Sequence, residues 1–206
     1  MSRGLGDVYK RQAQTALQNS INNATDVWNV ALDVKNKAFD QKSRYVKWGT
    51  AMRKYFNETN DVHYVSDMGY APNDKPQAWN SYFDAAKVTD EAEKEAFVEY
   101  GHRLYAILKE ANNGVDISMS ASAYKSQNDK AFTNGVNALD TEENETFEKA
   151  AEAVIASEGA IASISKDLDV AIGVAEEKKQ AEKAASTAYD EMFEAYGVHS
   201  QALEEA

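Results

Sequence analysis

The sequence predicts an all-α fold, an elongated antiparallel long-helix bundle, and three observations support this class. Apolar residues recur at steps of three and four along most of the chain, which is the period of one helix face. The 206 residues include only 2 Pro and 10 Gly, too few for a β-sandwich with its many turns. With 43% hydrophobic and 27% charged residues, the composition is that of a folded domain.

The composition also excludes several kinds of function. The formal net charge of -12 makes nucleic acid an unfavourable partner, because phosphate binding requires a basic surface. Since the chain has no Cys, it cannot form a disulfide, a thiolate zinc site or a cysteine nucleophile. No apolar run approaches the about 18 residues that a membrane-spanning helix needs.

The first twelve residues look foreign to the protein. Asp7–Gln12 is the translation of the bases GAT GTG TAT AAG AGA CAG, which resemble the transposon end used to build sequencing libraries. We therefore expect residues 1–12 to be a sequencing-adapter artefact and the native N-terminus to be missing. The alternative is a basic, flexible natural N-terminus. Residues 13–206 are expected to form a single helical domain.

A long first helix is predicted over residues 13–57, followed by a long aromatic loop at 58–75. Phe39 and Phe56 widen the apolar stripe of the helix. A loop of this length is either functional or covers the ends of helices, and the second interpretation is favoured. The loop aromatics are His63, Tyr64 and Tyr70. The helix stripe consists of Leu17, Ile21, Ala24, Trp28, Ala31, Val34, Ala38, Tyr45, Trp48, Met52 and Tyr55.

Two shorter helices follow the loop. Pro76 begins a helix over residues 76–87, because the N–H that proline lacks would be unpaired in the first turn. Asp90 and Glu93 form a capping pair for a second helix, which runs to about Ala111. Asn112-Asn113-Gly114 ends that helix, since Gly accepts the left-handed conformation found at helix C-termini.

The last third of the chain contains one extended segment and further helices. Residues 115–123 alternate apolar and polar side chains, but no second strand is available, so we interpret them as an extended connector. A short helix is predicted over 124–139, and Asp140-Thr141-Glu142-Glu143 predicts a new helix start. The final helix is predicted over 141–196, with a break near 176–183 or Gly197. Its stripe consists of Phe147, Ala151, Val154, Ile161, Ile164, Leu168, Ile172, Ala175, Ala185, Tyr189, Met192 and Tyr196.

The sequence identifies no catalytic, cofactor-binding or metal-binding residue. Glu99 and His102 form half of the Glu-x-x-His signature of di-iron bundles, but His63 and His199 lack a Glu at the required spacing. We expect the Glu99–His102 pair to face solvent. No serine lies in a nucleophile elbow, and no glycine-rich phosphate loop is present, so no cofactor is expected. The aromatic stripes are interpreted as core rather than as a ligand groove: Trp28, Tyr45, Trp48 and Tyr55; Trp79, Tyr82 and Phe83; Phe97 and Tyr100.

Several short motifs resemble the YiiG-like family of helical bacterial lipoproteins. The segment Lys42-Ser43-Arg44-Tyr45-Val46-Lys47-Trp48 is similar to a Ser-Arg-Tyr-x-x-Trp motif near the end of the family's first long helix. Asp84-Ala85-Ala86 and Leu108-Lys109-Glu110-Ala111-Asn112 continue the likeness, which is strongest at Tyr124-Lys125-Ser126-Gln127-Asn128-Asp129-Lys130-Ala131, followed by Gly135, Leu139 and Phe147. The resemblance covers about residues 14–170.

The chain also departs from the family pattern. Asn128 stands where an acid is usual, and Ala51–Tyr55 replaces a segment expected to be rich in Gly and Pro. The family's function is unassigned, so the resemblance carries over no site residue. It implies a location, namely the bacterial envelope or periplasm, with a lipid anchor on the missing N-terminus.

These observations lead to an expected function and two alternatives. We expect a non-enzymatic helical envelope lipoprotein or protein-interaction module with an unknown protein partner, no nucleic acid, and membrane attachment only through the lipid anchor. The first alternative is a phage or virion structural or scaffold protein, a role that acidic, helix-rich, Cys-free chains suit. The second is a ferritin-like di-iron oxidase, which the incomplete ligand set disfavours.

Overall fold

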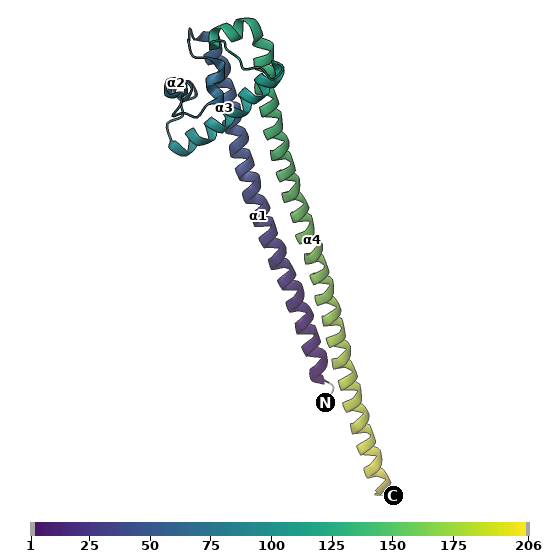
Figure 1. Cartoon of the computed structure of the whole chain (residues 1–206). Coiled ribbons are helices and arrows are strands. Elements are labelled where there is room, and N and C mark those ends of the chain that lie inside the picture. The colour runs from purple at the N-terminus through teal and green to yellow at the C-terminus, as the bar shows by residue number, and fades with distance from the viewer. Residues whose placement is uncertain (1–2, 205–206) are drawn as a thin grey trace. The chain divides into compact units, whose positions relative to one another are not determined.

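The computed structural model describes residues 3–204, with side chains described for Val8 and for residues 11–195. The structure is 87% helical and has no strand within that range, which confirms the all-α class. Figure 1 shows the elements in order: α1 (Arg3–Glu58), the 3-10 helix η1 (Val65–Gly69), α2 (Pro76–Ala86), α3 (Glu91–Ala111) and α4 (Ala121–Glu204).

The chain divides into two compact units, each of which contains parts of α1 and α4. The core unit consists of Ala31–Ala153 and holds η1, α2 and α3. The two-helix unit consists of Met1–Val30 and Val154–Ala206. None of the helices in the described range combines the length and the apolar character that a bilayer crossing needs.

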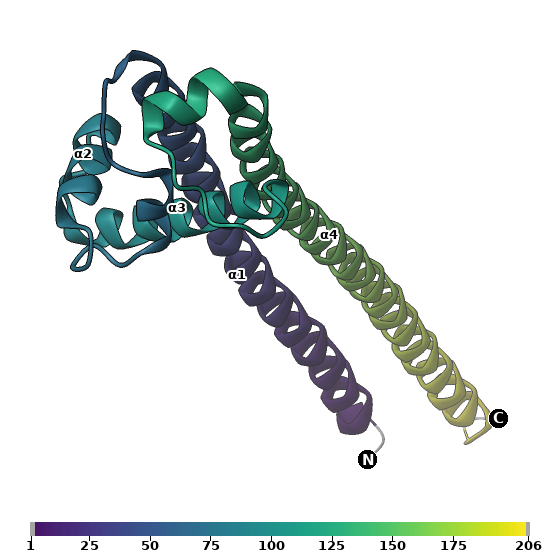
Figure 2. The same ribbon diagram turned by 45° about the horizontal axis from the view of Figure 1, so that its top comes forward.

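The core unit is built around buried aromatic rings. Figure 2 shows α2 and α3 gathered with the end of α1 and the start of α4. Trp48 packs edge-on against Phe97 at 5.2 Å between ring centroids, and Phe56 stacks on Phe132 at 4.3 Å. Aromatic side chains each bury about 150–250 Å² and dominate the energetics of such a core. The largest fully buried rings are Trp48, Trp79, Tyr45, Tyr82, Tyr100, Phe56, Phe97 and Phe132.

Most of the sequence-predicted core positions are confirmed. The predicted stripe of α1 is buried in the core unit at Ala38, Tyr45, Trp48 and Met52, whereas Val34 is exposed. Phe39 is also exposed, although its ring contacts Phe147 at 5.7 Å. The predicted aromatic stripes of α2 and α3 are core rather than a ligand groove.

The predicted ends of the short helices are confirmed by their backbone geometry. The carboxylate of Asp90 accepts a hydrogen bond from the N–H of Glu93 at 3.0 Å and so caps α3. Pro76 occupies the first turn of α2. Beyond α3, Asn113 and Gly114 adopt positive φ angles of 58° and 78°, which ends the helix as the sequence predicted.

The predicted extended connector crosses the loop that follows α1. The N–H of Val65 donates to the carbonyl of Met119 at 2.7 Å, and the N–H of Ala121 donates to the carbonyl of His63 at 3.1 Å. These bonds form one isolated antiparallel bridge between Tyr64 and Ser120. The connector therefore pairs with a loop residue rather than with a second strand. The predicted loop at 58–75 also contains a short 3-10 helix, η1.

The boundaries predicted for the last helices are wrong. α4 consists of two helical segments that join at a kink at Asn128, and the second segment has neither a start at 141 nor a break at 176–183 or Gly197. Only Asn128 has a non-helical backbone, with φ −136° and ψ 28°. Glu and Lys are good helix formers, so a charged run weakens the stripe without ending the helix. Residues 3–12 are likewise helical in the structure.

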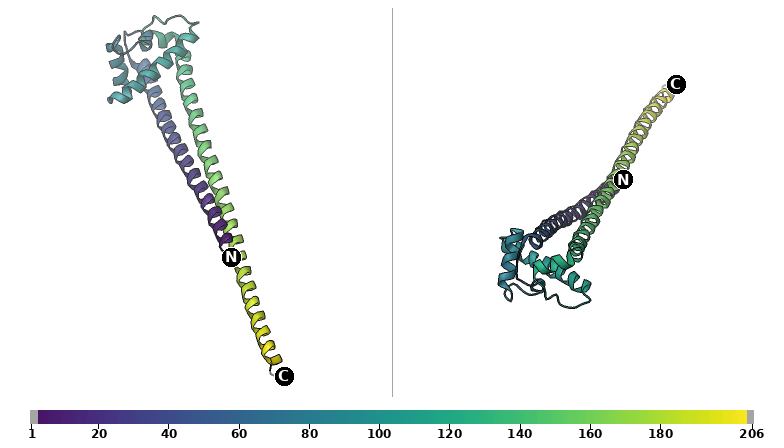
Figure 3. Two further views of the ribbon diagram at one scale, coloured as in Figure 1. Left: turned by 60° about the horizontal axis from the view of Figure 1, so that its bottom comes forward. Right: turned by 90° about the horizontal axis from the view of Figure 1, so that it is seen from above.

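In the two-helix unit the segments of α1 and α4 run in opposite directions (Figure 3). The indole N–H of Trp28 donates to Glu158 at 3.2 Å. Nearer the start of α1, Arg11 and Gln14 line the same shallow groove as Ile172 and Glu182. Residue numbers thus rise along one segment as they fall along the other. Figure 1 shows that α4 extends past the first described residue of α1.

We predict that Gly101→Ala destabilises the protein while Gly159→Ala does not. A Cβ on Gly101 would lie 2.6 Å from the ring of Trp79, whereas a Cβ on Gly159 would meet nothing within 4 Å. Trp79 is buried and rigid, so overpacking should cost about 1–3 kcal/mol of unfolding free energy. Gly159→Ala should gain up to about 1 kcal/mol from helix propensity. Urea unfolding followed by circular dichroism measures both, and equal midpoints for the two variants would contradict the packing.

Candidate functional site

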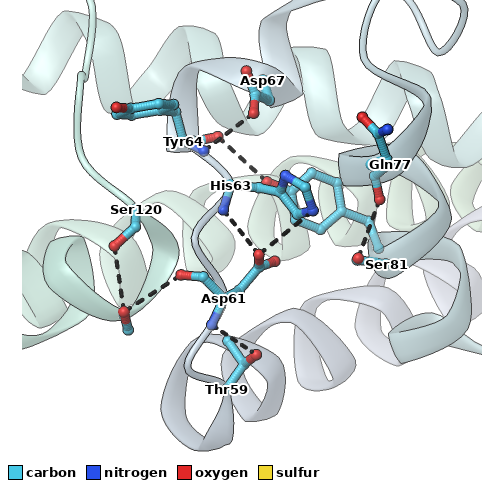
Figure 4. Close-up of polar contacts among 10 residues, drawn as sticks. Thr59, Asp61, His63, Tyr64, Asp67, Gln77, Ser81 and Ser120 are labelled. Atoms are coloured by element: carbon cyan, nitrogen blue, oxygen red, sulfur yellow. Dashed lines mark hydrogen bonds and ion pairs between the residues drawn. The ribbon is translucent and has the colours of Figure 1, made fainter.

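The loop after α1 contains a cluster of polar side chains centred on Asp61 (Figure 4). The carboxylate of Asp61 accepts a hydrogen bond from the backbone N–H of His63 at 2.8 Å. The imidazole Nε2 of His63 lies 3.7 Å from the same carboxylate oxygen, and the Asp61 side chain is only 7% exposed. The N–H of Asp61 donates to the hydroxyl of Thr59 at 3.1 Å. These contacts hold the loop in a fixed turn directly after the helix.

The nearby serines are not positioned for nucleophilic catalysis. The hydroxyls of Ser120 and Ser122 lie 3.3 Å apart, and that of Ser122 also donates to the carbonyl of Asp61 at 3.5 Å. Neither hydroxyl is hydrogen-bonded to the His63 ring, which a base-activated serine requires. The serines therefore tie the start of α4 to the loop.

A second buried carboxylate supports the 3-10 helix. Asp67 is 4% exposed and accepts a hydrogen bond from the N–H of Tyr64 at 3.1 Å. Lys75 pairs with Asp67 at 3.0 Å, and this hydrogen bond raises the pKa of the Lys75 ammonium. The indole N–H of Trp79 donates to the carbonyl of Tyr70 at 2.8 Å. The loop is thus packed over the core through Val65 and Met68 and braced by internal polar contacts, while Tyr64 and Tyr70 are half exposed.

The Glu99–His102 pair lies on the surface, as predicted. Both residues are exposed, and the His102 ring contacts the carbonyl of Tyr70 at 3.2 Å and the edge of Trp79. In the part of the chain that the structure describes, no three His, Asp or Glu residues come together as a metal site. The side chain of His199 lies outside the described residues. Among the side chains that the structure describes, no second half of a di-iron site forms around this pair.

An ion-pair network spans α1, α3 and α4 of the core unit. Arg103 donates to the hydroxyl of Tyr45 and to Glu143, both at 2.9 Å, and pairs with Glu142 at 2.7 Å. Burial opposes the charge of Arg103, but the hydrogen bonds to Glu143 and Tyr45 outweigh it, so the pKa of the guanidinium is raised. Glu143 is 8% exposed. A paired cation of this kind orients three helices rather than presenting a charge to a ligand.

A second polar cluster is incompletely paired. Arg53 donates to Asn137 at 2.6 Å and pairs with Asp140 at 3.5 Å. The other carboxylate oxygen of Asp140 and the hydroxyl of Tyr100 are buried and have no hydrogen-bond partner. Both lie next to Gly49, at 3.6 Å and 3.3 Å from where a Cβ would be. Burial raises the pKa of Asp140, and the charge of Arg53 partly counteracts that effect.

The cavity lined by Tyr100, one member of this cluster, offers no room for a substrate. The enclosed space beside Tyr100 has about 180 Å³ between atoms and is nowhere wide enough for a water molecule. Its walls are the apolar and aromatic core, including Met52, Trp79 and Leu104. The sequence did not identify the cluster of Arg53 and Asp140, because Asp140 had the appearance of a helix start and no local pattern links it to Arg53.

The two-helix unit exposes large apolar side chains. Tyr189, Met192 and Phe193 near the end of α4 are 61%, 64% and 66% exposed. The sequence placed Ile172, Tyr189 and Met192 on a buried stripe, and the structure corrects this. Ile172 is 38% exposed at the edge of the groove beside α1, and Tyr189 and Met192 are more than half exposed. Tyr196 lies outside the described side chains. The other exposed large apolar residues of this unit are Val8, Val27, Val30, Ile155, Val170 and Val174.

No protein-family model, curated protein or solved structure matches this chain. The resemblance to the YiiG-like lipoproteins therefore stays a prediction.

We predict that Asp140→Asn changes the pH dependence of stability. Since burial raises the pKa of Asp140, the folded state holds its proton more tightly than the unfolded chain does. The contribution of protonated Asp140 to the stability of the folded state is complete below the ordinary pKa of 3.8. It is lost as pH rises through the raised pKa of the folded protein. The unfolding free energy of the variant relative to the parent should therefore rise between about pH 3 and pH 7.

Asp116→Asn is the matched control. Lys109 and Tyr105 hydrogen-bond Asp116 and lower its pKa, so its stabilisation is present above the ordinary value and is lost as pH falls. The difference between that variant and the parent should have the opposite slope. Urea titrations at a series of pH values measure both differences, and slopes of the same sign would refute the burial of Asp140.

Proposed function

We propose that the protein is a non-enzymatic helical interaction module that binds a partner protein through its two-helix unit. The observation that carries this proposal is the set of exposed apolar side chains on that unit, with Ile155 66%, Val170 58% and Met192 64% exposed. Large apolar side chains exposed on one unit mark a candidate site of protein contact. Each Å² of apolar surface left in water forgoes about 25 cal/mol of burial free energy, which binding of a partner would provide.

The core unit supports the proposal by contrast. Its clustered polar groups are turned inward and tie helices together, as Arg103 does with Glu143. Its exposed large apolar residues include Val62 in the loop and Val115 in the connector, and also Val34, Phe39 and Val46 on α1. We propose that the core unit serves as a rigid scaffold. An elongated antiparallel bundle over the whole chain stays a prediction.

The resemblance to YiiG-like lipoproteins supports a proposed location in the bacterial envelope or periplasm. There the protein would be held to the membrane by a lipid on a residue upstream of the sequence described, rather than by a helix of this chain. Sequencing the intact gene tests this part. We expect a signal sequence followed by a Cys at its cleavage site, and a 5′ end that encodes neither would refute the lipoprotein assignment.

We predict that a photo-crosslinking amino acid at Val170 captures a protein partner in the native host, whereas one at Val115 does not. The two valines are 58% and 63% exposed, so they report equally on random encounters, but only Val170 lies in the two-helix unit. Mass spectrometry of purified adducts identifies the partner and the crosslinked peptide. Adducts at Val115 alone, or at neither position, would contradict the proposal.

A further inference from the structure

The side of α4 that packs against α1 continues past the start of α1. Ala171 and Ala175 are partly buried on that side, and Ala175 lines the groove that α4 shares with Arg11 and Gln14. Tyr189 follows Ala171 by about five full turns at 3.6 residues per turn, so it lies on the same side of the helix. Figure 3 shows that this part of α4 extends beyond α1.

Large apolar side chains occupy this continuation. Tyr189, Met192 and Phe193 are 61%, 64% and 66% exposed, and the rings of Tyr189 and Phe193 stack at 6.5 Å between centroids. At about 100° per residue, Met192 and Phe193 lie within about 60° of Tyr189 around the helix. These three residues form the end face of α4. Because the end face is continuous with the surface that α1 covers, it fits another helix in the position that α1 leaves.

The acidic residues of this part of α4 point away from the end face. Asp190, Glu191 and Glu194 lie about 100° or more from Tyr189 around the helix. Charged residues beside the seam of a helix pair select partners by charge, and the end face has none at those positions. Two copies of this acidic chain can therefore pair here without bringing their carboxylates into the seam. The residues beside the end face, within about 60° of Tyr189, are Ala185 and Ser186.

A second copy can reach the end face in one direction only. α1 lies on the same side of α4, so a second copy with a parallel α4 would place that helix where α1 already packs. A copy with an antiparallel α4 runs away from α1 and places its own end face against the first. Such a contact is isologous, because the same residues are used on both chains.

We propose that the end face of α4 is a self-association surface, on which the antiparallel α4 of a second copy of this chain docks. This inference rests on the proposed function and names the partner for this part of the two-helix unit. Tyr189, Met192 and Phe193 of each copy are buried against the same residues of the other. The second copy takes the position beside α4 that α1 leaves.

Analytical ultracentrifugation of the full chain and two variants tests this surface. The mass should double as concentration rises, and more readily at high salt, because salt screens the repulsion between two chains of net charge -12. Phe193→Glu places a carboxylate in the end face and should weaken dimerisation about tenfold or more. Ala184→Glu adds the same charge at an exposed position about 140° from Tyr189 and should change dimerisation less than about twofold. A monomer at every concentration, or equal weakening by both variants, overturns the proposal.

Single cysteines test the direction of pairing, since the chain has no Cys of its own. Antiparallel pairing predicts that Met192→Cys forms a disulfide between copies under oxidising conditions, whereas Val170→Cys does not. Val170 lies about 33 Å along the helix from Met192, so antiparallel copies hold their Val170 positions about 60 Å apart. A disulfide that forms at Val170 as readily as at Met192 would indicate parallel pairing and refute the proposed geometry.

The two proposals fail in different ways. If the photo-crosslinker at Val170 captures another protein in the host while the chain stays monomeric, self-association is wrong and the interaction module stands. If the chain dimerises through the end face but nothing is captured at Val170, the proposed partner site on the rest of the two-helix unit is wrong. A protein made from the intact gene that stays monomeric while this chain dimerises would assign the end face to an upstream segment, and that result also overturns self-association.

Discussion

Close approach of helices at glycine is the constraint on which the core unit depends. Gly101 of α3 lies under the ring of Trp79 from α2, and Gly49 of α1 lies under Val136 of α4, at distances where a Cβ could not fit. Packed interiors leave no void to absorb an added methyl group. The two glycines therefore fix how closely α1, α2, α3 and α4 approach one another in this unit, and the aromatic rings fill the space that remains.

The same close approach explains two of the buried polar groups that lack a hydrogen-bond partner. Because residue 49 is a glycine, the hydroxyl of Tyr100 and one carboxylate oxygen of Asp140 can lie in the interior beside its backbone. Desolvation then disfavours the carboxylate, and Arg53 compensates only in part because it is also hydrogen-bonded to Asn137. An unpaired buried polar group costs about 1–3 kcal/mol, so this cluster subtracts from the stability that the rings provide. Its position inside the packing gives it a structural rather than a chemical role.

Periodicity and local capping rules predicted the elements whose ends are decided by nearby residues. Asp90 with Glu93 marked the start of α3, and Asn113 with Gly114 marked the region after its end, because caps are local hydrogen bonds and local φ angles. The same local rule predicted a helix start at Asp140, and that prediction was wrong. Its carboxylate meets Arg53, which lies 87 positions earlier in the chain. No local pattern contains that contact, so the continuity of α4 could not be derived from the residues around it.

The exposed apolar residues of α4 show a further limit of periodicity, and one with functional meaning. An apolar stripe predicts that its side chains are buried. It does not say whether the same chain or a partner protein buries them. A single neighbouring helix covers part of α4, and Tyr189, Met192 and Phe193 near its end are 61%, 64% and 66% exposed. Under the proposed function, a partner protein buries these side chains.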